Sequence, residues 1–253
     1  VAMLRRQSKQ FPDIRPGGNR QLYTVTDACL SAFGVFHTQS PSFLAYPREM
    51  HVRKGKDNAQ SLFGVAVIPS DNEIRNLLDP VAPSHLGELY WWVLAQLQEQ
   101  GLLLDHHGYD GQWLCALDGV QYFASEAIHC DNCTHQQKGG KTLYTHHVIA
   151  PVLVAPGHDY VITLEPEFLT PQDGADKQDS QQAAAQRFAP DSVTILTDDL
   201  HSHQPFCAWL RTYHFNFILV CLPGSHAFLY EQIAELSQLN AVSESVINRW
   251  NGR

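Results

Sequence analysis

The chain of 253 residues lacks the features that would assign it to several large classes of protein. No stretch approaches the roughly 18 apolar residues of a membrane-spanning helix, because Pro and Thr interrupt the longest candidates. The first residues, VAMLRRQSKQFPD, contain no long apolar segment of the kind that marks a secretory signal. There is also no Gly-x-Ser-x-Gly elbow for a hydrolase nucleophile and no glycine-rich loop that would cradle a phosphate.

Cysteine is present but scattered. The six cysteines include one close pair, Cys130 and Cys133, and this distribution does not indicate a disulfide framework. It fits a reducing cytoplasm, where thiols remain free. The hydrophobic fraction of 44% is enough for a buried core, and the length predicts one large domain or two modest ones.

Charge is distributed unevenly along the chain. Residues 1–60 carry nine Lys and Arg against four Asp and Glu, whereas residues 61–253 carry eight against 22. A basic end on an acidic body favours contact with nucleic acid through that end, with metal-binding carboxylates elsewhere. The candidate phosphate-contacting residues are Arg48, Arg53, Lys54 and Lys56, together with the N-terminal arm. An ordinary solvated surface is the alternative interpretation.

The first part of the chain is predicted to be helical. Residues 1–21 are polar, contain Pro and Gly, and are expected to form an extended arm. The helix start signals within residues 22–107 are, in chain order, Thr24 or Thr26, Ser70 with Glu73, and Ser84. The last two of these helices would form either a DNA-binding helix-turn-helix or plain helical packing.

Residues 108–253 alternate between strands and helices. Strands are predicted over residues 114–125, 142–156, 159–166, 192–199 and 215–221. Helices are expected over residues 177–189, 204–214 and 226–239. This order of strands followed by alternating helices and strands predicts a mixed α/β sheet with helices on its faces, in which the first and fourth strands can be neighbours.

Two aspartates end apolar strands. Asp118 follows LCAL, and Asp198 follows VTILT. If these strands are neighbours, the two carboxylates could hold divalent metal ions, which prefer oxygen ligands. Two such ions drive phosphodiester chemistry, one by activating the nucleophile and the other by stabilising the leaving oxygen. The alternative is that both aspartates only cap turns.

The segment HCDNCTH contains His129, Cys130, Cys133 and His135. Thiolates and imidazoles at such spacing are the ligands of tetrahedral, structural zinc sites. Two further histidines, His146 and His147, follow shortly after and are additional candidate ligands. The alternative is a pair of reduced thiols in a loop.

Five longer blocks of sequence resemble one group of bacterial DDE-type insertion-sequence transposases. The blocks are FGVFHTQSPSFLAYPREM, SLFGVAVIPSDNEIRNLLDPV, ALDGVQYFASEAIHCDNC, LEPEFLTPQDGADKQDS and ILTDDLHSHQPFC, and the resemblance extends from about residue 22 to 250. It implies an RNase H-like core in residues 108–253, preceded by a helical DNA-binding region. It also implies that three acidic residues bind two Mg²⁺ ions, which cut DNA at element ends and join the freed 3′-OH to target DNA.

The resemblance assigns roles to individual residues. It places Asp118 and Asp198 as the first two catalytic acids and Mg²⁺ ligands, with Asp199 capping the following helix. Asp199 is the alternative second ligand, because both aspartates lie at the end of the same strand. It further implies that the protein binds DNA as a homodimer, in the bacterial cytoplasm at the nucleoid.

The chain departs from this family at several positions. Val120 stands where the family has Ser or Thr, and Ser180 stands where the family has Cys. The third acid of such transposases is a Glu on a later helix, and neither Glu231 nor Glu235 has matching flanks. The resemblance therefore predicts an incomplete core, C-terminally truncated, with impaired strand cleavage. The alternatives are a non-catalytic DNA-binding remnant with a structural zinc and, as a third class, a zinc-dependent hydrolase that uses the histidine cluster.

Overall fold

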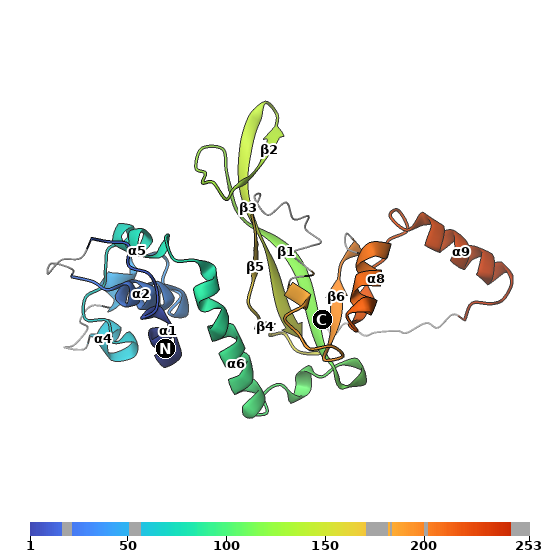
Figure 1. The fold of residues 1–253 in the computed structure, drawn as a ribbon, viewed down its shortest axis with the longest axis horizontal. Coiled ribbons are helices and arrows are strands. Elements are labelled where there is room, and N and C mark those ends of the chain that lie inside the picture. The colour runs from blue at the N-terminus through green and yellow to red at the C-terminus, as the bar shows by residue number, and fades with distance from the viewer. Residues whose placement is uncertain (17–21, 51–56, 171–181, 183, 200–201, 244–253) are drawn as a thin grey trace. The chain divides into compact units, whose positions relative to one another are not determined.

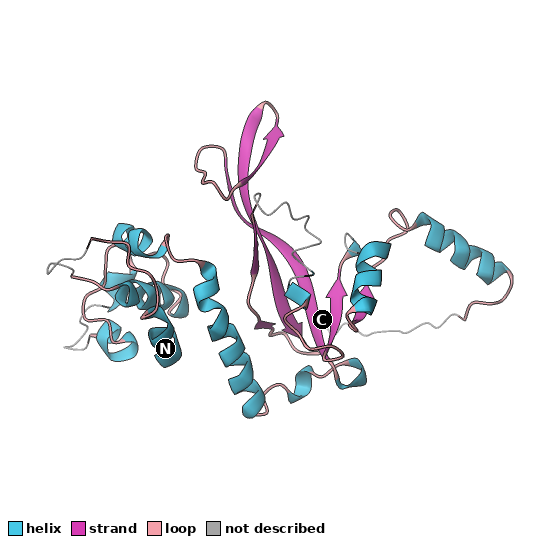
Figure 2. Cartoon of the chain, viewed as in Figure 1, coloured by secondary structure: helices cyan, strands magenta, loops and turns pink. Residues whose placement is uncertain are grey.

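The computed structural model describes residues 1–16, 22–50, 57–170, 182, 184–199 and 202–243. The chain divides into two compact units, Val1–Gln100 and Gly101–Arg253. The first unit is helical, and the second contains the sheet together with further helices (Figure 1, Figure 2). None of the described helices has the length and apolar character needed to cross a membrane.

The helical unit is arranged around α2. Its helices are α1 (Ala2–Ser8), α2 (Val25–His37), α3 (Tyr46–Met50), α4 (Asn58–Phe63), α5 (Asp71–Leu78) and α6 (Gly87–Glu99). The central helix packs against α1, α4 and α5. The expectation of an extended arm is therefore wrong for Ala2–Ser8, which form α1 with Leu4 buried. Leu30 of α2 is fully buried, as is Tyr46 of α3, and Phe63 of α4 belongs to the same core. Removal of these apolar side chains from water, at about 25 cal/mol per Å², stabilises the unit.

Two predicted helix caps of this unit are confirmed. The Thr24 hydroxyl accepts from Asp27 N–H at 3.0 Å, and the Asp27 carboxylate accepts from Thr24 N–H at 2.9 Å. This reciprocal cap supplies partners for two N–H groups that the start of α2 would otherwise leave unpaired. The Ser70 hydroxyl accepts from Glu73 N–H at 3.3 Å at the start of α5.

The predicted cap at Ser84 is wrong. Pro83 occupies the start of a 3-10 helix, Pro83–Leu86, and α6 follows from Gly87 without a side-chain cap. Proline is favoured at the first helical position because its φ is already helical and its missing N–H would lack a partner there. The N-cap consequently falls on Ala82, and Ser84 lies inside the 3-10 helix.

The second unit is built on a mixed sheet of seven described strands. They are β1 (Trp113–Ser125), β2 (Thr134–Lys138), β3 (Lys141–Val154), β4 (Ile162–Thr163), β5 (Glu167–Leu169), β6 (Val193–Thr197) and β7 (Asn216–Leu219). Their order is β2-β3-β1-β6-β7, with β4 and β5 also paired to β3. The β1–β3 pair is antiparallel, whereas β6 is parallel to both β1 and β7. The predicted mixed α/β class and the neighbouring first and fourth predicted strands are confirmed, and the order is consistent with an RNase H-like core.

The core of this unit lies where β1 and β6 run together. Strand β6 is buried along nearly its whole length, as expected for a central parallel strand. Helix α8 (Gln204–Thr212) packs against β7, and its Phe206 and Leu210, four residues apart on one helical face, are fully buried. Helix α9 (Ala227–Gln238) follows β7 in the chain, and short 3-10 helices at Leu104–His106 and Tyr109–Gly111 precede β1.

The sequence does not predict β2, because its residues THQQK are polar and lack an apolar alternation. The strand forms as half of a hairpin that ends at the pair Lys138↔Lys141. Gly139 and Gly140 make the turn with φ of 61° and 78°, and a two-residue hairpin turn of this hand needs positive φ at both central positions. The Gly-Gly pair is therefore the sequence feature that could have predicted this hairpin.

Two other predicted elements have a different outcome. The strand predicted over residues 159–166 is reduced to β4. Tyr160 lies outside any strand pairing, because its ring packs against His106 and His158, with centroid distances of 5.3 and 5.1 Å. Of the helix predicted over residues 177–189, residues 177–181 and 183 lie outside the described residues, whereas Gln182, Ala184 and Ala185 are helical.

Candidate functional site

Asp118 lies inside β1, and Asp198 directly follows the adjacent parallel strand β6. The β1–β6 register pairs Ala116 with Leu196, and the two aspartates each lie two residues further along. Neighbouring strands are about 4.8 Å apart, so continuation of this register brings the aspartates level with each other. Because side chains alternate along a strand, Leu117 is buried and Asp118 is exposed, and Asp198 is exposed as well.

The position of this pair in the sheet suits ligand binding. Asp198 comes directly after Thr197, the last residue of β6, and so marks the carboxyl end of a parallel strand. Open α/β sheets bind ligands at such ends, because side chains there are held by the core and face solvent. The expectation that Asp118 also ends a strand is wrong, because β1 continues to Ser125. The two carboxylates together supply the hard oxygen ligands that Mg²⁺ prefers.

Asp199 has a different role from the one predicted. Its carboxylate accepts from Leu222 N–H at 2.6 Å and from the Ser225 hydroxyl, and lies 3.1 Å from His226 Nδ1. These contacts tie the end of β6 to the turn before α9. The prediction that Asp199 caps the following helix is wrong, since the N-cap of α8 is His203 and has no side-chain cap. The hydrogen bond from Ser225, followed by that from Leu222, lowers the pKa of Asp199 below its ordinary value.

An Asp-His-Ser sequence of contacts runs through Asp199, His226 and Ser202. His226 Nε2 lies 3.0 Å from Ser202 Oγ and 2.8 Å from the Ser202 carbonyl oxygen. The Ser202 hydroxyl donates to the Asp199 carbonyl at 2.8 Å, and Ser202 is buried. A nucleophilic serine needs its proton directed to the imidazole and its oxygen open to substrate. Ser202 meets neither condition, so these contacts stabilise the fold. No sequence spacing indicated it, because its members lie 24 residues apart.

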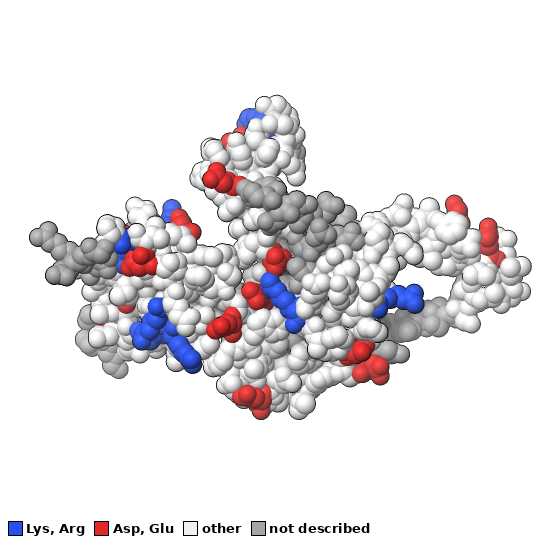
Figure 3. Space-filling view, in the orientation of Figure 1, with Lys and Arg blue, Asp and Glu red and all other residues white. Residues whose placement is uncertain are grey.

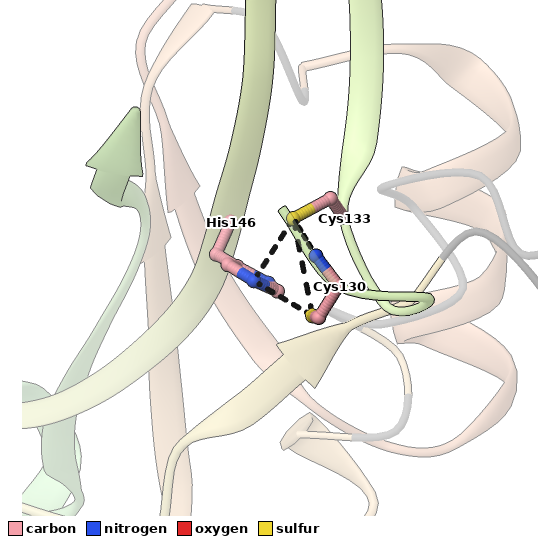
Figure 4. A group of neighbouring side chains, drawn as sticks. All are labelled: Cys130, Cys133 and His146. Atoms are coloured by element: carbon pink, nitrogen blue, oxygen red, sulfur yellow. Dashed lines mark hydrogen bonds between the residues drawn. The ribbon is translucent and has the colours of Figure 1, made fainter. Parts of the chain in front are cut away.

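Cys130, Cys133 and His146 form a compact group at the base of the β2–β3 hairpin (Figure 4). The two sulfurs are 3.9 Å apart, and His146 Nε2 lies 3.4 Å from Cys130 Sγ and 3.2 Å from Cys133 Sγ. The cysteines come from the loop between β1 and β2, and the histidine comes from β3. Among the described residues, these make up the one set of three His, Cys, Asp or Glu side chains whose ligand atoms lie within 4.8 Å of one another.

His129 and His135, the histidines predicted as ligands, lie outside this group. The His129 ring stacks on Tyr144, with centroids 4.4 Å apart, and its Nδ1 is 3.3 Å from the Ala127 carbonyl. His135 pairs with Tyr144 across the hairpin, two residues beyond Cys133 along the strand direction. Its ring nitrogens are not among the ligand atoms that lie within 4.8 Å of one another in the Cys130, Cys133 and His146 group. Sequence spacing could not choose between the histidines without the strand register.

His147, the other histidine considered, also lies apart from the cysteines. Its Nε2 is 3.1 Å from Thr145 Oγ1. Successive side chains of a strand point to opposite faces, so only one of His146 and His147 can face the thiols.

The predicted DNA-contacting residues are described only in part. Arg48 is exposed on α3, whereas Arg53, Lys54 and Lys56 lie outside the described residues. Basic and acidic side chains are interspersed on the face shown in Figure 3. Within the helical unit, the Arg15 guanidinium lies 2.6 Å from the Asp13 carboxylate. In α5, which would be the first helix of a helix-turn-helix, Ile74 and Leu77 are buried in the core of the helical unit.

Comparison with known proteins gives a distant likeness among solved structures. No protein-family model and no curated protein matches the chain. Among solved structures, the chain is similar to the piggyBac transposase in a cryo-EM structure of its synaptic complex with hairpin DNA, at 12% identity and a TM-score of 0.40. The match covers 86% of this chain and 46% of the other, so the chain spans less than half the length of that protein. A likeness at this level carries no argument about chemistry.

Proposed function

We propose that the protein acts on DNA in transposition, by metal-dependent strand cleavage and transfer, with Asp118 and Asp198 as Mg²⁺ ligands. The observation that supports this most directly is the strand register, which gives the two exposed carboxylates equivalent positions on adjacent strands. A divalent ion held there would activate the attacking water or 3′-OH and stabilise the leaving oxygen of a phosphodiester. The five sequence blocks that resemble DDE transposases supply the reaction class.

The contacts of Asp199 support Asp198 as the ligand of the two. Asp199 accepts from Leu222 and Ser225 and faces His226, so its oxygens are already committed to the fold. A carboxylate committed in this way would lose those donors if it turned toward a metal. Asp198 is the more exposed of the pair, on the level of Asp118.

The helical unit is proposed to bind the DNA. Arg48 and the basic residues at positions 53, 54 and 56 would contact phosphates, assisted by basic side chains within residues 1–21. Residues 22–107 would then be the DNA-binding region and residues 108–253 the catalytic region. Two copies bound to the two element ends would form a homodimer on DNA. The protein would act on chromosomal DNA in the bacterial cytoplasm.

A second candidate function is DNA binding without cleavage. Among the described residues, no third carboxylate forms a close group with Asp118 and Asp198. Two carboxylates can hold one ion, but stabilisation of both attacking and leaving oxygens requires a second. We therefore expect cleavage by the 253-residue chain to be slow.

A cleavage assay distinguishes the two functions. The substrate is DNA bearing the inverted repeats that flank the gene, with Mg²⁺ or Mn²⁺. Cleavage that is lost in Asp118→Asn and Asp198→Asn supports the proposed chemistry. The matched control is Asp191→Asn, an exposed aspartate with a φ of 58° that Asn tolerates. Binding of these ends with no cleavage, in wild type and variants alike, would favour the non-catalytic function.

A further inference from the structure

We infer that Cys130, Cys133 and His146 bind one Zn²⁺ ion, which fastens the base of the β2–β3 hairpin to the loop after β1. This site is separate from the proposed catalytic pair. In the β1–β3 register Asp118 stands opposite Ala150, four residues along β3 from His146. Four residues of a strand span about 14 Å, so one ion cannot serve both groups.

The three interatomic distances fit one face of a zinc tetrahedron. With Zn–S near 2.3 Å and Zn–N near 2.0–2.1 Å, tetrahedral angles give edges of about 3.8 Å between sulfurs and about 3.6 Å between sulfur and nitrogen. The corresponding separations are 3.9 Å between sulfurs and 3.2 and 3.4 Å between sulfur and nitrogen. All three side chains direct their donor atoms toward a common point (Figure 4).

The donor set selects the metal. Two thiolates and an imidazole are soft to borderline ligands, which suit Zn²⁺ and not Mg²⁺. Cys130 N–H also donates to Cys133 Sγ at 3.3 Å, a contact that stabilises charge on a thiolate. Cys130 is exposed, so the fourth position of the tetrahedron faces solvent, and water fills it.

The surroundings hold His146 in the orientation that the metal needs. The β1–β3 register shifts between Gln121 and Phe123, which leaves Tyr122 as a bulge. The Tyr122 ring stacks on His146, with centroids 5.7 Å apart and planes 18° apart, and the Phe123 ring lies 5.5 Å away. Bulges often re-aim side chains next to functional sites.

The hairpin needs such a fastening because it has little core of its own. His135, Gln136 and Gln137 of β2 are exposed, and in the loop before it Ile128 is exposed too. An isolated two-stranded hairpin is marginally stable in water, and bound metal adds its binding free energy to that of folding. Zn²⁺ would therefore order residues 126–146.

The test uses the full chain, purified under reducing conditions. We expect one equivalent of zinc per chain by elemental analysis, and Co²⁺ in its place should give thiolate-to-metal charge-transfer absorption. Cys133→Ser and His146→Ala should lower zinc affinity by more than the ~100-fold that loss of an outer-shell partner costs. The control variants His129→Ala, His135→Ala and Cys207→Ser should keep full zinc content.

A readout on the unmutated protein covers the case in which a variant fails to fold. Chelation should increase proteolysis and amide exchange within residues 126–146, and added Zn²⁺ should reverse both, while the helical unit stays unchanged. Three results would overturn the inference. They are a zinc-free chain that gives no Co²⁺ spectrum, a Cys130–Cys133 disulfide under reducing conditions, and zinc that is lost in His129→Ala or His135→Ala but kept in His146→Ala.

Discussion

Asp118 of β1 and Asp198 after β6 stand two residues beyond the same strand pair, Ala116↔Leu196. Two exposed carboxylates so placed repel each other unless a cation lies between them, and at about 4 Å in water the repulsion is about 1 kcal/mol. A separation of that size would lower the stability of the metal-free fold. Sites that bind metal commonly carry such a cost for function.

We predict that Asp118→Asn raises the free energy of unfolding in the presence of a chelator, by up to about 1 kcal/mol. The same substitution should remove the stabilisation that Mg²⁺ or Mn²⁺ gives, because half of the ligand pair is lost. Urea unfolding with and without Mn²⁺ measures both effects. Equal responses of wild type and variant to Mn²⁺ would show that the pair does not bind the ion.

For Arg48 we predict a change in the salt dependence of DNA binding. Each lost phosphate contact lowers the slope of log affinity against log salt by about one, so Arg48→Gln should have that effect on the full chain. The matched control is Arg75→Gln, an exposed arginine that lies 4.0 Å from Asp71 on the same helix. Fluorescence anisotropy at several salt concentrations gives the slopes. Identical slopes for the Arg48 variant and wild type would exclude a phosphate contact at this position.

Asp199 makes the sheet unit sensitive to acid. Its pKa in the folded chain is lowered, chiefly by the hydrogen bond from Ser225. The charged carboxylate therefore contributes stability that is fully present above the ordinary aspartate pKa of about 3.9 and is lost as the pH falls through the lower folded value. Asp199→Asn should flatten the fall in urea midpoint below about pH 4 and lower the midpoint at neutral pH. A variant with an unchanged acid profile would contradict this role.

The cap of α2 gives a prediction for the helical unit alone. Thr24→Ala removes the hydroxyl that accepts from Asp27 N–H and should cost about 1 kcal/mol of stability. Thr26→Ala, inside the same helix, should change stability by less than about 0.5 kcal/mol. Thermal unfolding followed by far-ultraviolet circular dichroism compares the two. Equal losses would show that the hydroxyl of Thr24 does not act as a cap.

The elements that the sequence predicts well are those with a local cause. The apolar start of β1, the buried run of β6 and the caps at Thr24 and Ser70 each follow from neighbouring residues. Strand β2 was not predicted, because its polar residues depend on a glycine turn and on β3 for their structure.

The site contacts that sequence reasoning could not choose between depend on residues far apart in the chain. His146 reaches the cysteines only because β3 folds back antiparallel to β1 and β2. Asp199 finds its partners more than twenty residues further along the chain, at Leu222, Ser225 and His226. Composition and spacing identify which residue types are available for a site, whereas strand register and long-range loops decide which of them meet.

The register of β1 on β3 also determines which side of the sheet each group faces. Opposed residues of a β-pair point to the same side, so Asp118 shares the side of Ala150. His146 lies four residues from Ala150 on β3, an even number, and therefore points to that side too. The carboxylates and the thiol-imidazole group are thus presented together, about 14 Å apart. That separation is less than half of one ~34 Å turn of duplex DNA, so a single duplex lying along β3 would pass over both.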